Sequence, residues 1–509
     1  MNINSDFNFA IVGGGTAGWI TALYVKRYYP ASKVTVIASS EIGILGAGEG
    51  TTPHFITFLK EVNIDLPGVM KAAKATLKSG IKFTNWNGDG KSYHHPFAQN
   101  ELDHTQLGTF WSTTSLFDLE QLAKGNNLNS LIFSAQASEN LLCPFKEDPN
   151  TPNGMKAVTD VALHFDANLL AEYLKSVAIE RGIIHIDNKV VGFNADDSGN
   201  INNIILDGNA EVPCNFVFDC SGFHRLIIGK FYNSQWNSYG KSLPVKKAIP
   251  FFIPNDIDSI SPVTESVAMK YGWMWKIPVQ GRYGCGYVFD SDFITPEQAK
   301  QELDQTLGFE VNSPRTFSFD PGSYEKVWIN NCLAIGLSQG FVEPLEATSI
   351  WVTINSLRYW LEHIAAVTDN DDRVRQKFNT KIKGINDAVL EFIHLHYRTS
   401  RTDSEFWTTF RDKNSSTDNI KRFEEEIQHS IPGPEFFRSF HDYFPAQSWH
   451  YVASGVGFYK PEIAQKMLDT HTQGLRQSIF RQHKDNYQKK FQYYYNTLVK
   501  HADFLKKFS

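Results

Sequence analysis

A cluster of glycines near the start of the chain has the spacing of a phosphate-binding turn. Gly13, Gly15 and Gly18 follow the apolar run 7–12, which is typical of a buried strand, and precede a helical pattern over residues 17–29. Glycines permit a tight turn and a close approach of the backbone to a pyrophosphate, which then faces the N-terminus of the helix. The cluster therefore predicts a dinucleotide site. It does not choose FAD over NAD, and an unoccupied glycine turn is the alternative.

The strand expected after this helix, residues 34–37, completes a βαβ unit. A dinucleotide site commonly has an acidic residue at the end of that strand to bind a ribose hydroxyl, but Ala38 stands here. Ser39, Ser40 or Glu41 is the expected substitute, and the choice among them stays open.

Glu346 and Thr348 precede a second helical pattern, which begins near Ser349. An acidic residue and a threonine at this place are ordinary capping residues of a helix N-terminus. The same geometry has a functional alternative, because the N–H groups of Thr348 and Ser349 would form an anion site.

The segment Trp273-Met274-Trp275-Lys276-Ile277-Pro278 is expected to form a β-strand. Side chains alternate along a strand, so Trp273, Trp275 and Ile277 share one face, and Pro278 is expected to end the pairing. Three bulky apolar groups on one face usually indicate core packing.

The composition indicates a globular enzyme and excludes several other classes of protein. The 509 residues are 42% hydrophobic and 20% charged, with a net charge of −6, whereas a nucleic-acid-binding domain is usually strongly basic. No run of eighteen apolar residues exists, so no membrane span is expected. The five cysteines show neither zinc nor redox spacing, which predicts reduced thiols, no metal site and a cytoplasmic location.

Hydrophobic periodicity predicts the remaining elements. Helices are expected over residues 67–78 and 168–181 and through most of the chain after residue 349. In a helix over 67–78, Lys71, Lys74 and Lys78 would share a solvated face. The basic, aromatic stretch 484–508 is expected to form a single packed helix. Further strands are expected around Val190 and Ile204, over 215–219, and through the strand-rich middle, 245–335.

Together with the glycine turn, the tryptophan strand resembles the flavin-dependent halogenases, and the resemblance extends over roughly residues 8 to 460. Residues 44–53 match the family's Gly-x-Gly-Glu-x-Thr-x-Pro loop near the flavin. Residues 77–86 match the segment with its essential lysine, and residues 341–349 match the loop with its active-site glutamate. The resemblance implies that Lys78 and Glu346 are the catalytic residues.

The loop after Glu346 departs from many tryptophan-directed members of that family. Those members read Glu-Ser-Thr-Gly, whereas this chain reads Glu-Ala-Thr-Ser, so the serine hydroxyl next to the glutamate is missing. The resemblance implies that Thr348 and Ser349 bind the halide.

Two later segments resemble aromatic-hydroxylase flavoproteins and favour FAD. They are residues 218–222, which carry Asp219, and residues 334–338, where Leu337 replaces the usual aspartate. The implied fold is α/β, an FAD-binding fold of the aromatic-hydroxylase/glutathione-reductase type over residues 1–360, followed by a largely helical substrate-side region over 361–509. The residues expected to bind FAD are Gly13, Gly15, Thr16, Ala17, Gly18, Ser39, Gly48, Glu49, Val190, Asp219, Gly222, Gly336, Ser349 and Ile350.

The resemblance also implies a substrate site for an aromatic ring. His95-Pro96-Phe97 resembles the family's His-x-Phe, which sandwiches the ring, and Phe444 and Trp449 resemble a C-terminal substrate wall. Trp273 and Trp275 are expected to separate the flavin from the substrate. Groups that would hold the charged end of tryptophan are not recognisable, so indole or phenol rings are the expected substrates.

The implied enzyme is an FADH2-dependent halogenase, which uses oxygen and a halide to make hypohalous acid. The expected partners are a separate NAD(P)H flavin reductase, the halide and a small aromatic substrate, with a homo-oligomer as a possible assembly. Bromination and iodination are expected at least as readily as chlorination. The alternatives are a flavin-dependent aromatic monooxygenase, which hydroxylates directly, and a non-catalytic binding protein with a flavoprotein fold.

Overall fold

The protein folds into two compact units, each built from separated stretches of the chain. The computed structural model describes residues 3–43, 49–97, 116–151, 153–313, 315–364, 367, 371–411, 415–440, 443–473 and 475–508. The first unit contains residues 1–75, 165–239 and 320–387, and the second contains 76–164, 240–319 and 388–509. The boundary expected near residue 360 therefore falls inside the first unit, because the chain passes repeatedly between the units.

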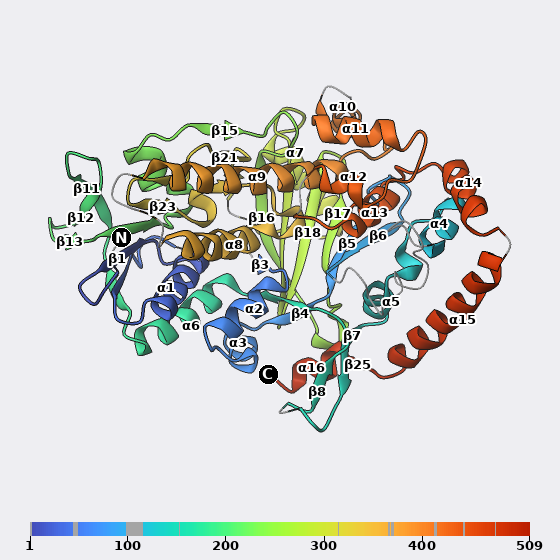
Figure 1. The fold of residues 1–509 in the computed structure, drawn as a ribbon, viewed down its shortest axis with the longest axis horizontal. Coiled ribbons are helices and arrows are strands. Elements are labelled where there is room, and N and C mark those ends of the chain that lie inside the picture. The colour runs from blue at the N-terminus through green and yellow to red at the C-terminus, as the bar shows by residue number, and fades with distance from the viewer. Residues whose placement is uncertain are drawn as a thin grey trace. The chain divides into compact units, whose positions relative to one another are not determined.

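A six-stranded sheet forms the centre of the first unit (Figure 1). Five of its strands are parallel, and only the edge strand β22 is antiparallel to its neighbour β23. The expected βαβ unit is confirmed, since helix α1 connects the adjacent parallel strands β1 and β2. In order across the sheet, the strands are β10 (Ile184–Asp187), β2 (Lys33–Ala38), β1 (Asn8–Val12), β14 (Phe216–Asp219), β23 (Cys332–Ala334) and β22 (Trp328–Ile329).

Helices and two small sheets complete the first unit. Helix α1 packs against α6 and α8. Trp360 of α8 lies among Phe9, Phe216 and Phe218 of the sheet, with ring centroids 4.9 to 6.3 Å apart. The helices are α1 (Thr16–Tyr28), α2 (His54–Glu61), α3 (Leu66–Ala72), α6 (Ala167–Glu180) and α8 (Thr348–His363). The small sheets consist of β11 (Val190–Ala195), β12 (Ile201–Leu206) and β13 (Glu211–Pro213), and of β15 (Trp236–Ser238), β21 (Gly322–Tyr324) and β24 (Gly340–Phe341).

A seven-stranded, mostly antiparallel sheet forms the centre of the second unit (Figure 1). The expected tryptophan strand is β18, but pairing does not end at Pro278, which lies opposite Tyr283 of β19. On its other side β18 pairs with β17 only as far as Lys276, so Pro278 occupies an edge position, where a missing N–H is tolerated. In order, the strands are β20 (Phe317–Ser318), β16 (Lys247–Pro254), β19 (Arg282–Phe289), β18 (Gly272–Val279), β17 (Thr264–Ala268), β5 (Gly80–Thr84) and β6 (Ser92–Pro96).

The helix expected over residues 67–78 is wrong in its second half. Helix α3 ends at Ala72, Lys74 adopts a left-handed conformation with φ 48°, and residues 76–78 form strand β4. Strand β4 pairs with β9 (Ala162–Phe165), placing Lys78 opposite Ala162. Lys78 is therefore fully buried on a strand and does not share a solvated helical face. Tertiary pairing outweighs the local helical pattern.

The single helix expected over residues 484–508 is also wrong. Helix α15 (Leu475–Tyr495) ends before strand β25 (Leu498–Lys500), and helix α16 (His501–Lys506) follows. Strand β25 adds to the edge of β7 (Leu142–Glu147), which also pairs with β8 (Met155–Ala157). A partner strand thus breaks the helix at a place that the local sequence does not mark.

Most of the other helices of the second unit contribute buried residues to one aromatic core. That core contains Phe392, Phe423, Phe437 and Trp449, all buried. Helix α9 (Asp372–His396) contains the boundary between the units. The remaining helices are α4 (Leu116–Ala123), α5 (Phe133–Glu139), α7 (Pro296–Leu307), α10 (Glu405–Arg411), α11 (Asp418–Glu426), α12 (Pro434–Arg438), α13 (Ala446–Gly455) and α14 (Pro461–His471).

All five cysteines are buried free thiols. Among the described residues, no helix has the length and apolarity needed to cross a bilayer. Within the same residues, His, Cys, Asp and Glu side chains form no cluster of three or more that could hold a metal ion.

Candidate active site

The carboxyl ends of parallel strands bring the glycine turn together with two later segments. Strands β1, β14 and β23 end at Val12, Asp219 and Ala334, which occupy matching positions in the sheet. A Cβ on Gly13 would lie 2.1 Å from the Cys220 carbonyl oxygen, so the turn after β1 packs directly on the turn after β14. The edge of a parallel sheet at which strand ends meet is the usual position of a dinucleotide.

Helix α1 presents its N-terminus at this edge. Its first turn is compact, since a Cβ on Gly18 would lie 2.0 Å from the Gly13 carbonyl oxygen. Gly15 is the N-cap and has no side chain to occupy the first N–H groups of the helix. A Cβ on Gly336 would lie 2.7 Å from the Ala17 Cβ, so the loop after β23 closes on the same turn. This arrangement fits a bound pyrophosphate.

Glu49 adds a titratable group to the glycine turn. The Thr16 hydroxyl donates to its carboxylate at 3.4 Å. Burial raises the pKa of Glu49 to about 7, with a smaller contribution from the charge of Asp166, while the Thr16 hydrogen bond opposes the rise. Gly48, expected beside it, lies outside the described residues.

Asp219 has a structural role that its motif alone did not reveal. One carboxylate oxygen accepts hydrogen bonds from the Ser221 amide and hydroxyl, at 3.1 and 2.6 Å. The other accepts from the Ile227 and Ile228 amides, both at 2.9 Å. The carboxylate therefore orders the turn containing Gly222, and a cofactor contact by Asp219 itself stays a prediction.

The expected ribose end of the site contains a carboxylate that sequence reasoning missed. Asp187, at the end of β10, lies opposite Ala38 and accepts the Ser40 amide at 2.8 Å, a bond that lowers the pKa of Asp187. Ser39 accepts the Glu41 amide at 3.3 Å, and Glu41 pairs with Lys189. Strand pairing, and not the local motif, puts Asp187 there. Val190, also expected at the cofactor, is partly buried at the start of β11.

The loop before α8 holds Glu346 in a buried position, with 3% of its surface exposed. The N-cap of α8 is Ala347, in a left-handed conformation with φ 53° that is strained for a residue with a Cβ. Its methyl group cannot cap the helix, so neither Glu346 nor Thr348 is the N-cap. Thr348 is buried and Ser349 is exposed, and Ile350 follows as a buried residue of α8.

In the second unit, the structure brings Lys78, His95 and Phe97 together. The Phe97 amide donates to the Ser79 carbonyl oxygen at 3.4 Å, and His95 lies opposite Ile81 in the β5–β6 hairpin. The Lys78 ammonium lies 5.1 Å from the centroid of the Phe97 ring, within the range of a cation–π contact. A buried cation therefore adjoins the aromatic pair expected to sandwich the substrate.

The residues expected to line the substrate differ in their surroundings: His95 has a hydrogen-bond partner, whereas Phe444 and Trp449 pack against other aromatic rings. The His95 Nε2 lies 2.9 Å from the Ser448 hydroxyl, and the His95 ring lies 5.1 Å from Phe392. Phe444 is partly buried and stacks on Phe392 at 4.1 Å. Trp449 is 1% exposed and packs in the aromatic core, so packing accounts for it and a substrate contact stays a prediction. Ser448 and Phe392 were missed because long-range contacts alone connect them to His95.

The two tryptophans of β18 differ in burial. Trp273 is fully buried, and its indole N–H donates to the Tyr397 hydroxyl at 3.0 Å. Trp275 is partly exposed, with its ring 6.3 Å from that of Trp273. It lies over Gly286, where a Cβ would come within 2.0 Å of the indole. Core packing therefore explains Trp273, whereas Trp275 has surface available for contact.

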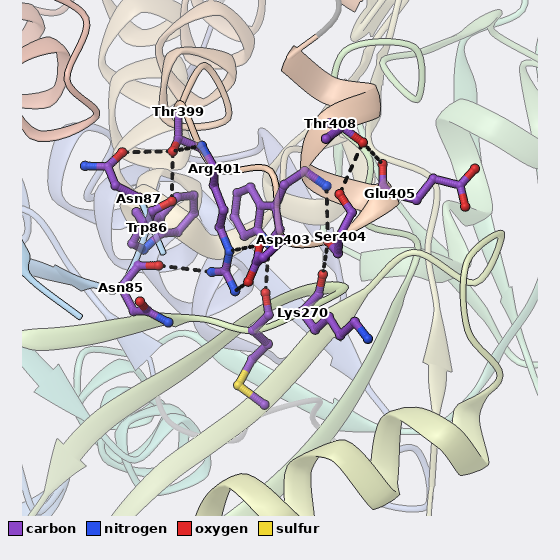
Figure 2. A network of polar contacts seen from close by, with 12 residues as sticks. Asn85, Trp86, Asn87, Lys270, Thr399, Arg401, Asp403, Ser404, Glu405 and Thr408 are labelled. Atoms are coloured by element: carbon purple, nitrogen blue, oxygen red, sulfur yellow. Dashed lines mark hydrogen bonds and ion pairs between the residues drawn. The ribbon is translucent and has the colours of Figure 1, made fainter. Parts of the chain in front are cut away.

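A polar network holds the turns of both hairpins that carry these residues (Figure 2). The Arg401 guanidinium donates to the Asn85 carbonyl oxygen at 3.0 Å and to both Asp403 carboxylate oxygens, at 2.5 and 2.8 Å. The Ser404 hydroxyl donates to the Lys270 carbonyl oxygen at 2.6 Å. Asn85 lies in the β5–β6 turn and Lys270 in the β17–β18 turn, so one loop fixes both.

Comparison with known proteins decides the family. Residues 8–473 match the tryptophan halogenase family. The chain belongs to that family. It is 31% identical to 7-chloro-L-tryptophan 6-halogenase KtzR of Kutzneria sp. (strain 744) over 491 residues, which cover 92% of this chain and 94% of the relative.

Solved halogenases have the same fold. Tar14, a tryptophan C-6 flavin-dependent halogenase (chlorinase) from taromycin biosynthesis, superposes with a TM-score of 0.88 at 27% identity, covering 99% of this chain and 100% of Tar14. BrvH, a flavin-dependent halogenase from Brevundimonas sp. BAL3, gives 0.84 at 28% identity and covers 99% of each chain. The family resemblance and the α/β class are confirmed, and the protein is a flavin-dependent halogenase.

The halogenase divides its candidate residues between the two units. The glycine turn, Glu346 and the helix α8 N-terminus belong to the first unit, and Lys78, His95 and the tryptophan strand belong to the second.

Proposed function

We propose that the protein uses FADH2, oxygen and a halide to make hypohalous acid, with which it halogenates an indole- or phenol-type ring. The observation that carries this proposal is the buried Lys78 ammonium, 5.1 Å from the Phe97 ring centroid. The Phe97 ring gives the ammonium a cation–π contact. Because Phe97 is also expected to stack on the substrate, Lys78 would offer a catalytic hydrogen-bond donor beside the substrate ring.

The first unit supplies a site that fits FAD, in a fold of the aromatic-hydroxylase/glutathione-reductase type. Gly13, Gly15, Thr16, Ala17 and Gly18 would hold the pyrophosphate at the N-terminus of α1. The remaining candidate contacts are Ser39, Gly48, Glu49, Val190, Asp219, Gly222, Gly336, Ser349 and Ile350. Asp187, which lies opposite Ala38, is a further candidate. When bound and reduced, FAD would supply the two electrons that reduce oxygen to the peroxide level, at which oxygen can oxidise the halide to hypohalous acid. A separate NAD(P)H flavin reductase would supply FADH2.

The loop at the N-terminus of α8 is the proposed halide site, through the N–H groups of Thr348 and Ser349. A long helix with an alanine N-cap leaves these donors to an anion. Bromide and iodide are expected to serve at least as well as chloride, because they are easier to oxidise and lose less hydration energy on entering a closed site.

The second unit is the proposed site of ring substitution. Lys78 would hold the oxidant there by donating a hydrogen bond. Glu346, a residue of the first unit, is the other proposed catalytic residue and would polarise the oxidant or accept the ring proton. His95 and Phe97 would stack on the ring and so choose the carbon that reacts. Trp275, and behind it Trp273, would form the partition from the flavin.

Indole and small phenols are the proposed substrates in preference to free tryptophan. The Phe392 ring packs beside His95, and Phe444 stacks on Phe392, so the surroundings of His95 are aromatic and apolar. Such surroundings discriminate weakly among aromatic substrates.

The deciding experiment combines the protein with FAD, NADH and an added flavin reductase, and follows product mass on indole, phenol and tryptophan. Product that carries bromine or chlorine only when the matching halide is present supports the proposal. A product gaining one oxygen without halide would make the enzyme a hydroxylase. Purified protein that binds no flavin would favour the alternative of a non-catalytic binding protein with a flavoprotein fold. Equimolar chloride, bromide and iodide in one reaction test the halide order, and a much higher kcat/KM for tryptophan would refute the substrate assignment.

A further inference from the structure

A buried histidine from the C-terminal helix contacts the backbone of the strand that carries Lys78. The His501 Nε2 lies 3.2 Å from the Leu77 amide nitrogen, and its Nδ1 lies 3.0 Å from the Ile260 carbonyl oxygen. An amide can only donate and a carbonyl can only accept, so Nε2 is the unprotonated nitrogen and Nδ1 carries the hydrogen. Both bonds require a neutral imidazole.

A second buried histidine, His164, contacts the side chain of Thr76 in the same strand. The Thr76 hydroxyl donates to the Pro278 carbonyl oxygen at 2.7 Å, so it accepts from the His164 Nδ1, 3.2 Å away. The His164 Nε2 lies 2.8 Å from the Thr264 hydroxyl. His164 therefore connects β4 to β17, and Thr76 connects β4 to the end of the tryptophan strand β18.

The fold gives His501 a fixed place. Strand β25 pairs with β7 directly before it, and the His501 amide donates to the Leu141 carbonyl oxygen at 2.9 Å. Phe504, one turn further along α16, packs on Phe145 at 4.6 Å. The helix break between α15 and β25 is what allows this segment, 424 residues after Leu77, to reach β4.

We propose that His501 and His164 are positioning residues for Lys78, and that the C-terminal segment 498–506 is thereby part of the halogenation site. Neither imidazole is assigned a contact with substrate or flavin. Each acts through the backbone or a hydroxyl of strand β4, which sets where the Lys78 ammonium lies. The inference rests on the proposed function of Lys78.

The electrostatic environment agrees with this geometry. Burial lowers the pKa of His501 to about 4, against the weaker effect of its bond to Ile260. Burial, followed by the charges of Lys78 and His501, holds the pKa of His164 well below its usual value. Both rings therefore stay neutral at neutral pH, and neither adds a like charge beside the buried ammonium.

The test compares His501→Ala and His501→Gln with His394→Ala. His394 is an equally buried histidine of the same unit whose Nδ1 contacts the Ser242 carbonyl oxygen, so its loss controls for general destabilisation. Thr76→Val supplies a nearly isosteric variant on the other side of the network. Three quantities are measured for each protein: FAD affinity, halogenated product formed per reduced flavin consumed, and amide hydrogen exchange in the peptide that contains Leu77.

We expect His501→Ala to keep FAD affinity within about twofold and to lose about ten- to a hundredfold in product per flavin, since small misplacements of a catalytic group have effects of that size. Hypohalous acid should escape to a small scavenger instead. Exchange at Leu77 should rise. His501→Gln should partly restore product per flavin and the protection of Leu77 from exchange, because its side-chain oxygen can accept the Leu77 amide. Thr76→Val should show both defects in weaker form. His394→Ala should show neither defect.

Equal uncoupling in His394→Ala, or unchanged product and exchange in His501→Ala, would overturn the inference. If His501→Ala does not fold, Thr76→Val and His501→Gln decide it by the same measurements. If the wild-type protein makes no halogenated product, the proposed function fails separately. Exchange at Leu77 then still decides whether His501 holds β4.

Discussion

The two units of the halogenase bury their polar groups for different purposes. In the first unit, polar groups line the end of a parallel sheet, and Asp219 and the glycines shape backbone turns. In the second unit, neutral histidines and one lysine are buried inside the fold, as His164, His501 and Lys78 show. The first arrangement suits a cofactor bound largely by backbone groups. The second suits a single side chain, that of Lys78, whose position must be fixed.

The largest expected effect is the loss of Lys78. We expect Lys78→Ala to lower halogenation by about a thousandfold, the upper end of what one preorganised hydrogen-bond donor contributes. FAD affinity should be retained, because Lys78 belongs to the second unit. Product formation and flavin fluorescence measure the two separately. Lys71→Ala, which changes an exposed lysine of α3, is the matched control. Near-native turnover in Lys78→Ala would contradict a catalytic role for the second unit.

Glu346 tests whether the first unit also contains a side chain that takes part in the chemistry. We expect Glu346→Gln to lower the rate about a hundredfold, the usual range for losing one acid–base group, with little change in Tm or FAD affinity. Glu362→Gln, an exposed residue further along α8, should be silent. Loss of FAD from the Glu346 variant would show instead that this residue is structural.

Among the imidazole and carboxyl groups, those with the largest pKa shifts predict opposite responses to pH in the two units of the flavin-free protein. Burial lowers the pKa of His394 and His501 to about 4 and that of His450 to about 3. Below about pH 6.5 the unfolded chain takes up protons at these positions and the folded chain does not. Each such histidine therefore costs the second unit about 1.4 kcal/mol per pH unit until its folded pKa is reached.

Glu49 acts in the other direction in the first unit. Its folded pKa of about 7 lies above the unfolded value, so its stabilising contribution is complete below about pH 4.5 and is lost as the pH rises through 7. Hydrogen exchange at pH 7, 5.5 and 4.5 should show the second unit opening first on acidification. Glu49→Gln should flatten the response of the first unit alone. Simultaneous opening of both units would contradict the comparison.

A pair of glycine substitutions separates flavin binding from stability. Gly13→Ala places a methyl group against the backbone carbonyl oxygen of Cys220, where φ is +120°, so it should both strain this turn and weaken FAD binding. Gly286→Ala places one against the Trp275 indole, an overpacking that typically costs about 1–3 kcal/mol. FAD titration and thermal unfolding should show that both variants lose stability and that only the first loses flavin. Loss of flavin in the second variant would mean that the two units do not have separate tasks.

The sequence by itself determined the family, the βαβ unit and the elements whose residues are local to their motif. Gly13, Gly15 and Gly18 could be interpreted from spacing alone, because that spacing is a local pattern; the contact of Gly13 with Cys220 needed the tertiary structure. The tryptophan strand could be identified for the same reason, since alternation along a strand is a local property. The α/β class followed from these elements.

Tertiary structure decided everything that depends on pairing between distant strands. It turned the expected helical Lys78 into a buried strand residue, broke the C-terminal helix at β25 and kept Pro278 within β18. It also put Asp187 opposite Ala38 and His501 beside Leu77. Periodicity reports which face of an element is apolar, but hydrogen bonds between remote segments decide what that element becomes, and no local pattern encodes them.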